Sequence, residues 1–357
     1  MNIVFRADSN KSIGMGHIMR CLSIADEFKC CDNGIIFVLA DQTVRDVVQN
    51  RGYEVIDLGS DYKDMDSELD YWPKIDTDVL IVDSYFVTAS YLLALKNKTK
   101  KLVYIDDIYS LAYPVDILIN YNAYGDFIDY DTLYKTAGIP KPVLLLGPTF
   151  APLRTMFRGV EKKEQKKHVQ DVLISTGGSD ELHVALLTAR YLVEKEYDQY
   201  IFHFLVGALN TDKEIIRQLV ESRNNIILHE NVTDMKALIC SMDLAISAAG
   251  STLYEICACG VPLITYVIAD NQIPGAKAFE KLGLGVNIGD LRVYLKVEST
   301  QEISTCLDRD FPNKVIDELE LLDDNYKRRI EMAGLMQRII DGEGINRIVQ
   351  KIKSELS

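Results

Sequence analysis

Short, nearly continuous runs of Val, Ile and Leu recur along the chain, with helical or mixed segments between them. In the first half they cover residues 3–6, 35–40, 54–57, 79–83, 102–105, 117–119 and 143–146. In the second half they cover residues 171–175, 201–206, 226–228, 244–247 and 263–267. Strands without polar alternation are buried on both faces, which is typical of parallel sheets covered by helices. The sequence therefore predicts an α/β fold with right-handed crossovers.

A charged segment that is poor in apolar residues, at 158–167, separates the two series of runs, and we interpret it as an interdomain linker. With 357 residues, 48% of them hydrophobic, the chain is long enough for two domains that each have a core. We predict an N-terminal Rossmann-like domain over residues 1–160 and a C-terminal one over residues 168–335. Two such domains facing each other would form a cleft.

Composition narrows the possible partners and locations. The net charge of −14 argues against nucleic acid and anionic membranes, so an anionic ligand must be held by local backbone and helix dipoles. No apolar run approaches the roughly 20 residues that span a bilayer, and no signal-peptide pattern begins the chain; we expect a cytoplasmic protein without membrane insertion. The seven cysteines, including the adjacent Cys30 and Cys31 and the close pair Cys257 and Cys259, favour free thiols over disulfides or zinc.

The first apolar run leads into a glycine turn and a helical pattern, over residues 13–20. Gly14 and Gly16 permit positive φ and close approach of a ligand, and His17 lies in the first turn of the helix. The helix dipole disfavours an imidazolium there, so we expect a neutral ring that can accept a proton. A histidine that merely caps or packs is the alternative, but the glycines and Arg20 favour function. Met19 stands where a dinucleotide fingerprint needs glycine, and no P-loop lysine follows.

Polar side chains follow several of the other predicted strands. They include Asp83, Ser84 and Tyr85 after the fourth run, Asp106 and Asp107 after the fifth, and Asn120 and Asn122 after the sixth. Ordinary turn chemistry explains many of the Asp and Asn residues. Tyr85 is different, because a tyrosine directly after a buried strand places a hydroxyl at the edge of the sheet where ligands bind.

Two glycine turns and one polar stretch follow strands of the second half. Gly177 and Gly178 end the first strand of this half, and Gly250 precedes a helix that Ser251 opens. Backbone N–H groups of such a turn can hold a diphosphate without a metal, and Glu255 can accept hydrogen bonds from ribose hydroxyls. A capping box formed by Ser251 and Glu255 is an equally good interpretation of the same spacing. A polar stretch that follows the strand over residues 263–267 is expected to line the cleft, and it includes Asn271 and Gln272.

These motifs together carry a family resemblance. Residues 250–272 look like the nucleotide-sugar half-site of the glycosyltransferase-B fold, especially that of the bacterial N-acetylglucosaminyltransferases that form lipid II. With residues 5–9, 14–20, 82–85, 119–124 and 266–272, the chain resembles the UDP-diacetamido-trideoxy-altropyranose hydrolases of pseudaminic acid biosynthesis and the related spore-coat polysaccharide proteins. The resemblance covers roughly residues 1–290.

The resemblance implies an enzyme that removes UDP from an activated amino sugar by breaking the anomeric C–O bond with inversion, without metal or other cofactor. His17 would activate water, Tyr85 and Asn271 would contact sugar and diphosphate, and UDP would be held by Gly250, Ser251 and Glu255. The other candidate substrate- or UDP-binding residues are Gly14, Gly16, Arg20, Asp83, Gly177, Gly178 and Gln272. Residues 336–357 would form a final helix that packs back on the first domain, as in this fold; the helical stretch after residue 290 is longer than in compact relatives.

Two alternatives concern metal and function. Residues 64–66 and 76–78 match the D-x-D pattern of metal-dependent sugar transferases, but loop acidity explains both, and a helix N-terminus can bear the diphosphate charge. Besides the hydrolase, an inverting UDP-sugar glycosyltransferase and a non-catalytic nucleotide-sugar binding protein remain open. In each case the expected partner is a small-molecule UDP-amino sugar, and we expect a monomer.

Overall fold

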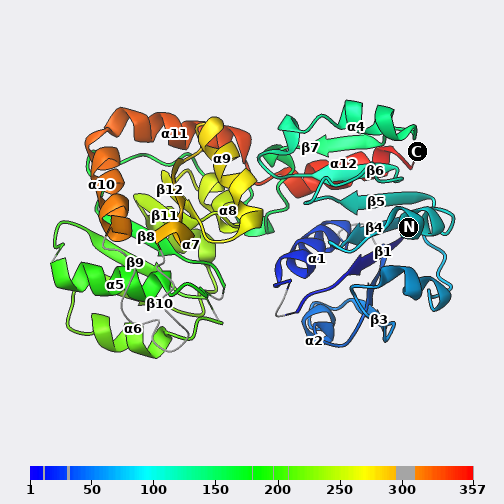
Figure 1. Ribbon diagram of the computed structural model, residues 1–357, viewed down its shortest axis with the longest axis horizontal. Helices are drawn as coiled ribbons and strands as arrows, with labels where there is room; N and C mark the ends of the chain where they lie inside the picture. Colours follow the sequence, from blue (N-terminus) through cyan, green and yellow to red (C-terminus); the bar gives the residue numbers. More distant parts are fainter. Residues whose placement is uncertain are drawn as a thin grey trace. The chain divides into compact units, whose positions relative to one another are not determined.

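The computed structural model describes residues 1–10, 13–29, 33–178, 180–195, 197–207, 209–294 and 310–356 (Figure 1). The chain divides into two compact units, and each is described here by itself. The first unit consists of Met1–Thr155 and Gly342–Ser357, and the second of Met156–Asp341. The sequence-predicted domain limits are residues 160, 168 and 335, whereas the divisions between the units lie at Thr155/Met156 and Asp341/Gly342. That the two domains face each other across a cleft stays a prediction.

The described part of the first unit contains a seven-stranded parallel sheet. Its strands, in sheet order, are β3 (Glu54–Asp57), β2 (Gly34–Leu39), β1 (Asn2–Ala7), β4 (Val79–Asp83), β5 (Lys101–Ile105), β6 (Ile117–Asn120) and β7 (Val143–Leu146). Its α-helices are α1 (Gly16–Lys29), α2 (Arg45–Gln49), α3 (Ala89–Lys96), α4 (Tyr130–Ala137) and α12 (Gly344–Ser354). The strand order reverses between β1 and β4, which is the switch point where open α/β sheets place ligands.

The second unit repeats this design with six parallel strands in its described part. Its strands, in sheet order, are β10 (Ile226–His229), β9 (Ile201–Leu205), β8 (Asp171–Ser175), β11 (Leu244–Ala248), β12 (Leu263–Val267) and β13 (Val286–Asp290). Its α-helices are α5 (Val184–Lys195), α6 (Lys213–Val220), α7 (Met235–Ser241), α8 (Thr252–Ala258), α9 (Ile273–Lys281), α10 (Asp310–Asp324) and α11 (Tyr326–Ile339). The switch point of this sheet lies between β8 and β11.

The predicted α/β architecture is confirmed, and each predicted apolar run is a strand. All residues of β4, β11 and β12 are buried, as expected for strands covered on both faces. Analysis of the sequence missed β13, because Asn287, Gly289 and Asp290 interrupt its apolar pattern. An edge strand has a neighbour on one side only, and this one pairs with β12 in an irregular register, so its sequence carries a weak strand signal.

The helix α12 belongs to the first unit, although it lies at the end of the chain (Figure 1). Its buried residues Ile345, Ile348, Val349 and Ile352 form one face at helical spacing, and the helix packs against α1. At its start Gly344 is required sterically, since a Cβ there would lie 2.2 Å from the carbonyl oxygen of Ala151. The helix α12, at the end of the chain, therefore contributes to the core of the same unit as β1, at its start.

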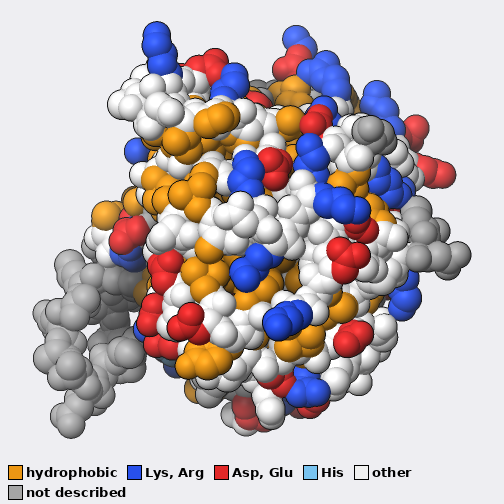
Figure 2. Space-filling model, turned by 90° about the vertical axis from the view of Figure 1, so that its right-hand side faces the viewer, with side chains coloured by type: hydrophobic (Ala, Val, Ile, Leu, Met, Phe, Trp, Pro, Cys, Tyr) orange, Lys and Arg blue, Asp and Glu red, His pale blue; other side chains and the backbone are white. Residues whose placement is uncertain are grey.

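Among the described residues, charged side chains of both signs lie on the surface, and the cysteines are buried or half-buried free thiols. On the face shown in Figure 2, basic and acidic side chains are interspersed. Cys21, Cys257 and Cys259 are buried free thiols and Cys240 is a half-buried one, while Cys30, Cys31 and Cys306 lie outside the described residues. In the described ranges no helix is both long and apolar enough to cross a bilayer.

Candidate active site

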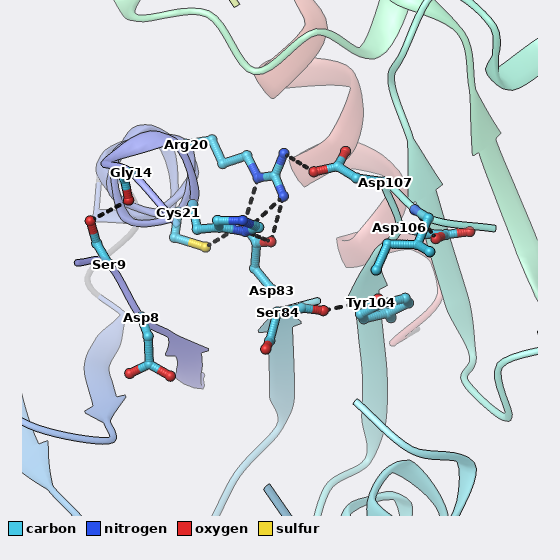
Figure 3. Close-up of polar contacts among 12 residues, drawn as sticks. Asp8, Ser9, Gly14, Arg20, Cys21, Asp83, Ser84, Tyr104, Asp106 and Asp107 are labelled. Carbon is cyan, nitrogen blue, oxygen red and sulfur yellow. Dashed lines mark hydrogen bonds and ion pairs between the residues drawn. The ribbon is translucent and has the colours of Figure 1, made fainter. Parts of the chain in front are cut away.

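Side chains from four neighbouring strands meet at the carboxyl edge of the first sheet (Figure 3). His17 lies in the first turn of α1 and Arg20 three residues later, after the loop that follows β1. Asp83 ends β4, Asp107 follows β5 and Tyr121 follows β6. Since β1 and β4 flank the switch point, this cluster occupies the place where ligands enter folds of this kind.

His17 and Asp83 form a buried hydrogen-bonded pair. The Nδ1 atom of His17 lies 2.5 Å from Oδ1 of Asp83, and the two residues are 3% and 1% exposed. Although burial alone would raise the pKa of Asp83, the positive charge of Arg20 and the hydrogen bonds from Arg20 and His17 hold that pKa well below its usual range. An ionised Asp83 accepts the Nδ1 proton, so in the neutral ring the lone pair is on Nε2. The pair thus prepares Nε2 to accept a proton.

Arg20 holds Asp83 from the other side. Its Nε donates to Oδ2 of Asp83 over 2.5 Å, its Nη2 donates to Oδ1, and its Nη1 lies 2.7 Å from both Oδ2 of Asp107 and the hydroxyl of Tyr121. The Nη2 atom is also 3.0 Å from Nδ1 of His17. Both of these nitrogens carry hydrogen and share the same carboxylate oxygen. Four of the five guanidinium N–H groups thereby have partners inside the protein, which makes Arg20 a support of the pair.

One thiol and two serine hydroxyls at this edge of the sheet contact groups other than the imidazole of His17. The Sγ of Cys21 lies 3.5 Å from Oδ2 of Asp83, and burial raises the pKa of this thiol well above its usual value. Ser9 donates to the carbonyl oxygen of Gly14 over 2.6 Å, and the hydroxyl of Ser84 accepts from the backbone N–H of Phe86. The arrangement therefore suits activation of an incoming hydroxyl or water better than covalent catalysis.

Tyr85 covers the imidazole from the solvent side. Its ring meets His17 edge to face, with centroids 4.4 Å apart, and the residue is 37% exposed. Burial and the charge of Asp107 raise the pKa of Tyr85 to about 12. The hydroxyl therefore stays protonated at neutral pH and can donate a hydrogen bond to a ligand.

A buried ionic cluster fixes the segment that leads into the glycine turn. The guanidinium of Arg6 pairs with Glu68 and Asp8, and Glu68 also accepts from the hydroxyls of Ser60 and Tyr91 at 2.9 and 3.1 Å. Arg6 and Glu68 are 0% exposed, so each charge depends on the others for compensation. This cluster anchors Asp8 immediately before the turn that carries His17.

The glycine turns of the second unit lie at its own switch point. Gly177 and Gly178 follow β8, and Gly177 has φ of +88°. Ser251 begins α8 without any side-chain capping hydrogen bond, so the capping-box interpretation does not hold for it. Glu255 is half-buried in the first turn of α8.

All five candidate glycines are free of crowding by the protein, and Gly14 and Gly177 among them have positive φ. A Cβ added at Gly16, Gly178 or Gly250 would meet no heavy atom within 4 Å, and none of the three has positive φ. By contrast, a Cβ at Gly207 would lie 2.3 Å from the carbonyl oxygen of Gly178. Open space over these backbones is what close approach of a ligand requires.

The polar stretch after β12 has two different environments. Asn271 is exposed on the short helix η5 (Asp270–Gln272). Gln272 turns inward, and its Oε1 accepts from the backbone N–H of Ile268 over 2.9 Å. Gln272 therefore shapes this loop, whereas Asn271 is accessible to a ligand.

Both D-x-D stretches have structural partners. Asp66 accepts hydrogen bonds from Thr88 and Ser90 at the start of α3. Asp78 precedes β4, at the edge opposite to His17, and pairs with Lys100 over 2.6 Å. Within the described ranges, no group of three or more His, Cys, Asp or Glu residues could hold a metal ion.

Two residues of the cluster were not among the sequence-predicted site residues. Asp107 and Tyr121 both contact Arg20. Asp107 belongs to the polar residues noted at strand ends, but its partner lies far away in the sequence. Tyr121 lies within residues 119–124, which were used only for the family resemblance, and it was not singled out by itself.

Comparison with known proteins gives one domain family and several relatives. The Glycosyltransferase family 28 C-terminal domain matches residues 149–300. Uncharacterized protein MJ1062 of Methanocaldococcus jannaschii is 26% identical over 76% of this chain, which spans only 56% of that protein. Spore coat polysaccharide biosynthesis protein SpsG of Bacillus subtilis is 26% identical over 81% of this chain and 84% of its own length. The UDP-2,4-diacetamido-2,4,6-trideoxy-beta-L-altropyranose hydrolase of Campylobacter jejuni is 28% identical over 66% of this chain and 81% of its own length.

Solved structures identify the fold. MurG of Acinetobacter baumannii superposes with a TM-score of 0.67 at 13% identity, covering 99% of this chain and 100% of that one. The glycotransferase of kitacinnamycin gives 0.68 at 14% identity, covering 100% of this chain and 99% of that one. The chain has the glycosyltransferase-B fold, with two Rossmann-like domains, as predicted.

Proposed function

We propose that the chain belongs to the family of its relatives SpsG and the altropyranose hydrolase, and that it is a nucleotide-sugar hydrolase. The reaction releases UDP from a UDP-amino sugar by attack of water at the anomeric carbon. From the name of the Campylobacter relative, we propose UDP-2,4-diacetamido-2,4,6-trideoxy-β-L-altropyranose, or a close UDP-amino sugar, as substrate. The product would enter pseudaminic acid or related surface polysaccharide biosynthesis.

The observation that carries the proposal is the hydrogen bond between Asp83 and Nδ1 of His17. It leaves the lone pair of a neutral ring on Nε2, where it can take a proton from water as the oxygen attacks. The new bond joins that oxygen to the anomeric carbon, while the C–O bond to UDP breaks and its electron pair stays on the β-phosphate oxygen. In-line displacement inverts the anomeric configuration. A positioned base of this kind contributes about 10²–10⁴-fold in rate.

The second unit would hold the leaving group. Backbone N–H groups at the turn of Gly250 and Ser251 would bind the diphosphate, and Glu255 the ribose. The open space over Gly178 and Gly250 and the absence of a cap at Ser251 support this assignment. Asn271 would contact the sugar or diphosphate. Arg20 and Asp83 would act by positioning His17, since their polar groups are already paired within the protein.

A second candidate is an inverting glycosyltransferase, which the match of residues 149–300 to the Glycosyltransferase family 28 C-terminal domain favours. It would use the same base and the same leaving group, but a sugar hydroxyl would replace water. The difference lies in the acceptor alone.

The test is UDP release from UDP-amino sugars with no acceptor present. The hydrolase proposal predicts steady turnover by the wild type and none by His17→Asn, which should still bind UDP. Glu255→Gln should show the opposite pattern, with weaker UDP binding, because one or two charge-assisted hydrogen bonds of about 1.5–3 kcal/mol each are altered. UDP release that appears only after a sugar acceptor is added would contradict the hydrolase and support the transferase.

A further inference from the structure

Four neighbouring strands of the first sheet are each followed by an exposed apolar side chain. Met15 follows β1, Tyr85 follows β4, Tyr109 follows β5 and Phe127 follows β6, and these residues are 41%, 37%, 40% and 45% exposed. Single exposed apolar residues are common on protein surfaces. Here, however, they follow the carboxyl ends of adjacent strands, the same edge of the sheet as the cluster of His17. This edge therefore offers apolar contacts next to the proposed base.

Tyr109 stands out among them by its backbone. Its φ is +47°, in the left-handed region that glycine and asparagine tolerate and that costs a tyrosine free energy. Such a conformation persists only where the surroundings impose it. A tyrosine at this position therefore lowers the stability of the fold, so its presence must be explained by something other than stability.

The carboxylate of Asp106 imposes the conformation. Its Oδ1 accepts from the backbone N–H groups of Ile108 and Tyr109, at 2.9 and 2.7 Å, and its Oδ2 accepts from the hydroxyl of Tyr130 at 2.9 Å. Asp106 is 0% exposed, so this clamp is built into the core. The clamp fixes the loop after β5 but requires no aromatic side chain at position 109.

The ring of Tyr109 is connected to the His17 cluster by two contacts. It packs against the ring of Tyr124, with centroids 5.6 Å apart, and the Tyr124 hydroxyl donates to the carbonyl oxygen of Asp107 over 2.9 Å. The side chain of Asp107 in turn pairs with Arg20. The exposed ring of Tyr109 thus lies at the rim of the same site and is supported from behind.

We propose that Tyr109 is a specificity-determining residue, whose clamped, exposed ring packs against an apolar part of the sugar. This inference rests on the proposed function. A sugar with acetamido groups and a methyl in place of a hydroxymethyl presents more apolar surface than an ordinary hexose, and an aromatic face is suited to bind it. The strained tyrosine is then retained for substrate binding at the expense of loop stability.

The test replaces Tyr109 by residues that suit its backbone. In Tyr109→Gly and Tyr109→Asn, relief of the positive φ should raise the melting temperature by a few degrees. The same variants should lower kcat/KM for the diacetamido sugar nucleotide at least tenfold, and weaken its binding in titration calorimetry, while the affinity for UDP alone stays unchanged. Tyr109→Phe keeps the ring and should stay within a few-fold of wild type. Tyr71→Asn, at a 68% exposed tyrosine after the helix η1 (Met65–Asp70), is the matched control and should change neither activity nor binding.

Two outcomes would overturn the proposal. One is wild-type kcat/KM and wild-type sugar-nucleotide affinity in both Tyr109→Gly and Tyr109→Asn. The other is a fall of melting temperature in both variants, because the ring would then stabilise the loop. Failure of the proposed function is a separate result, in which the wild type itself releases no UDP; the calorimetric comparison still decides the role of Tyr109 in that case.

Discussion

At the scale of single residues, Asp83 determines which nitrogen of His17 carries the proton. Its carboxylate accepts from Nδ1, and the positive charge of Arg20 together with the hydrogen bonds from Arg20 and His17 holds its pKa well below the usual range despite burial. Asp83 therefore stays ionised through neutral and mildly acidic pH. The hydrogen bond that orients His17 should therefore persist over that range.

The first prediction concerns Asp83→Asn. An asparagine amide can donate to Nδ1 and so favour the tautomer with hydrogen on Nε2, which cannot accept a proton from water. We expect kcat to fall about 10²–10⁴-fold with UDP affinity unchanged. Steady-state kinetics and titration calorimetry measure the two quantities.

The control for this variant is Cys21→Ala, which removes another neighbour of Asp83 without touching His17. It should keep most of the activity. Since Arg20 retains Asp107 and Tyr121 when Asp83 is replaced, the Asp83→Asn protein should remain folded, which circular dichroism can verify. Wild-type kcat in a folded Asp83→Asn protein would remove Asp83 from the proposed mechanism.

Individual site residues could be predicted from the sequence, but their contacts could not. His17, Arg20, Asp83 and Tyr85 each follow a strand, so the edge on which they lie was predictable. The pairing of His17 with Asp83 joins residues 66 positions apart, and it depends on β1 and β4 being neighbours in the sheet. No local pattern encodes that neighbourhood. Arg20 was for this reason assigned to the ligand, whereas its guanidinium is paired inside the protein.

At the scale of secondary-structure elements, β9 and β10 carry a pair of stacked histidines. Nδ1 of His203 lies 2.9 Å from Nε2 of His229, and Nε2 of His203 lies 3.1 Å from a carboxylate oxygen of Asp171. With both rings neutral, His229 donates to His203 and His203 donates to Asp171. Burial and the neighbouring His203 lower the pKa of His229.

The second prediction follows from the sign of that shift. The unfolded chain takes up a proton at His229 below a pH of about 6.5, whereas the folded protein resists it until a lower pH. Stability is therefore unaffected above that value and falls as the pH drops below it. His229→Gln keeps a donor for His203 but cannot titrate, so its melting temperature should fall less than that of the wild type between about pH 7.5 and 5.5. An equal fall in melting temperature for the wild type and His229→Gln would show that His229 does not contribute to the pH dependence of stability.

Elements were predicted well wherever their sequence is uniformly apolar. Strand β13 was missed because polar residues and a glycine interrupt it. The helix α8 shows the complementary difficulty, since Ser251 and Glu255 resemble a capping box although Ser251 makes no cap. Residue spacing alone cannot distinguish a helix whose first backbone N–H groups are capped by its own side chains from one whose N–H groups can bind a ligand.

At the scale of the whole molecule, one architectural plan occurs twice. Each unit has a parallel sheet whose order reverses beside its first strand, and each carries a glycine turn at that point. The chemical content differs, because His17 with its carboxylate lies in the first unit and the glycines proposed to hold UDP lie mainly in the second. Periodicity and composition were sufficient to predict this repetition. The domain limits and the facing of the two sites depend on long-range packing and stay predictions.

The roles proposed for the two units predict which bond breaks during hydrolysis. If His17 activates water toward the sugar while the second unit holds the diphosphate, the oxygen of water must join the anomeric carbon and never phosphorus. Helix N-termini and backbone donors would stabilise the departing UDP, so chelating agents should not impair the reaction.

The most direct test of this account is hydrolysis in water labelled with heavy oxygen, followed by mass spectrometry of the UDP. The nucleotide is the better product to examine, because a free sugar exchanges its anomeric oxygen with solvent. The account predicts UDP of unchanged mass. UDP that contains the heavy isotope, or formation of UMP together with a sugar phosphate, would mean attack at phosphorus and would contradict the role given to His17.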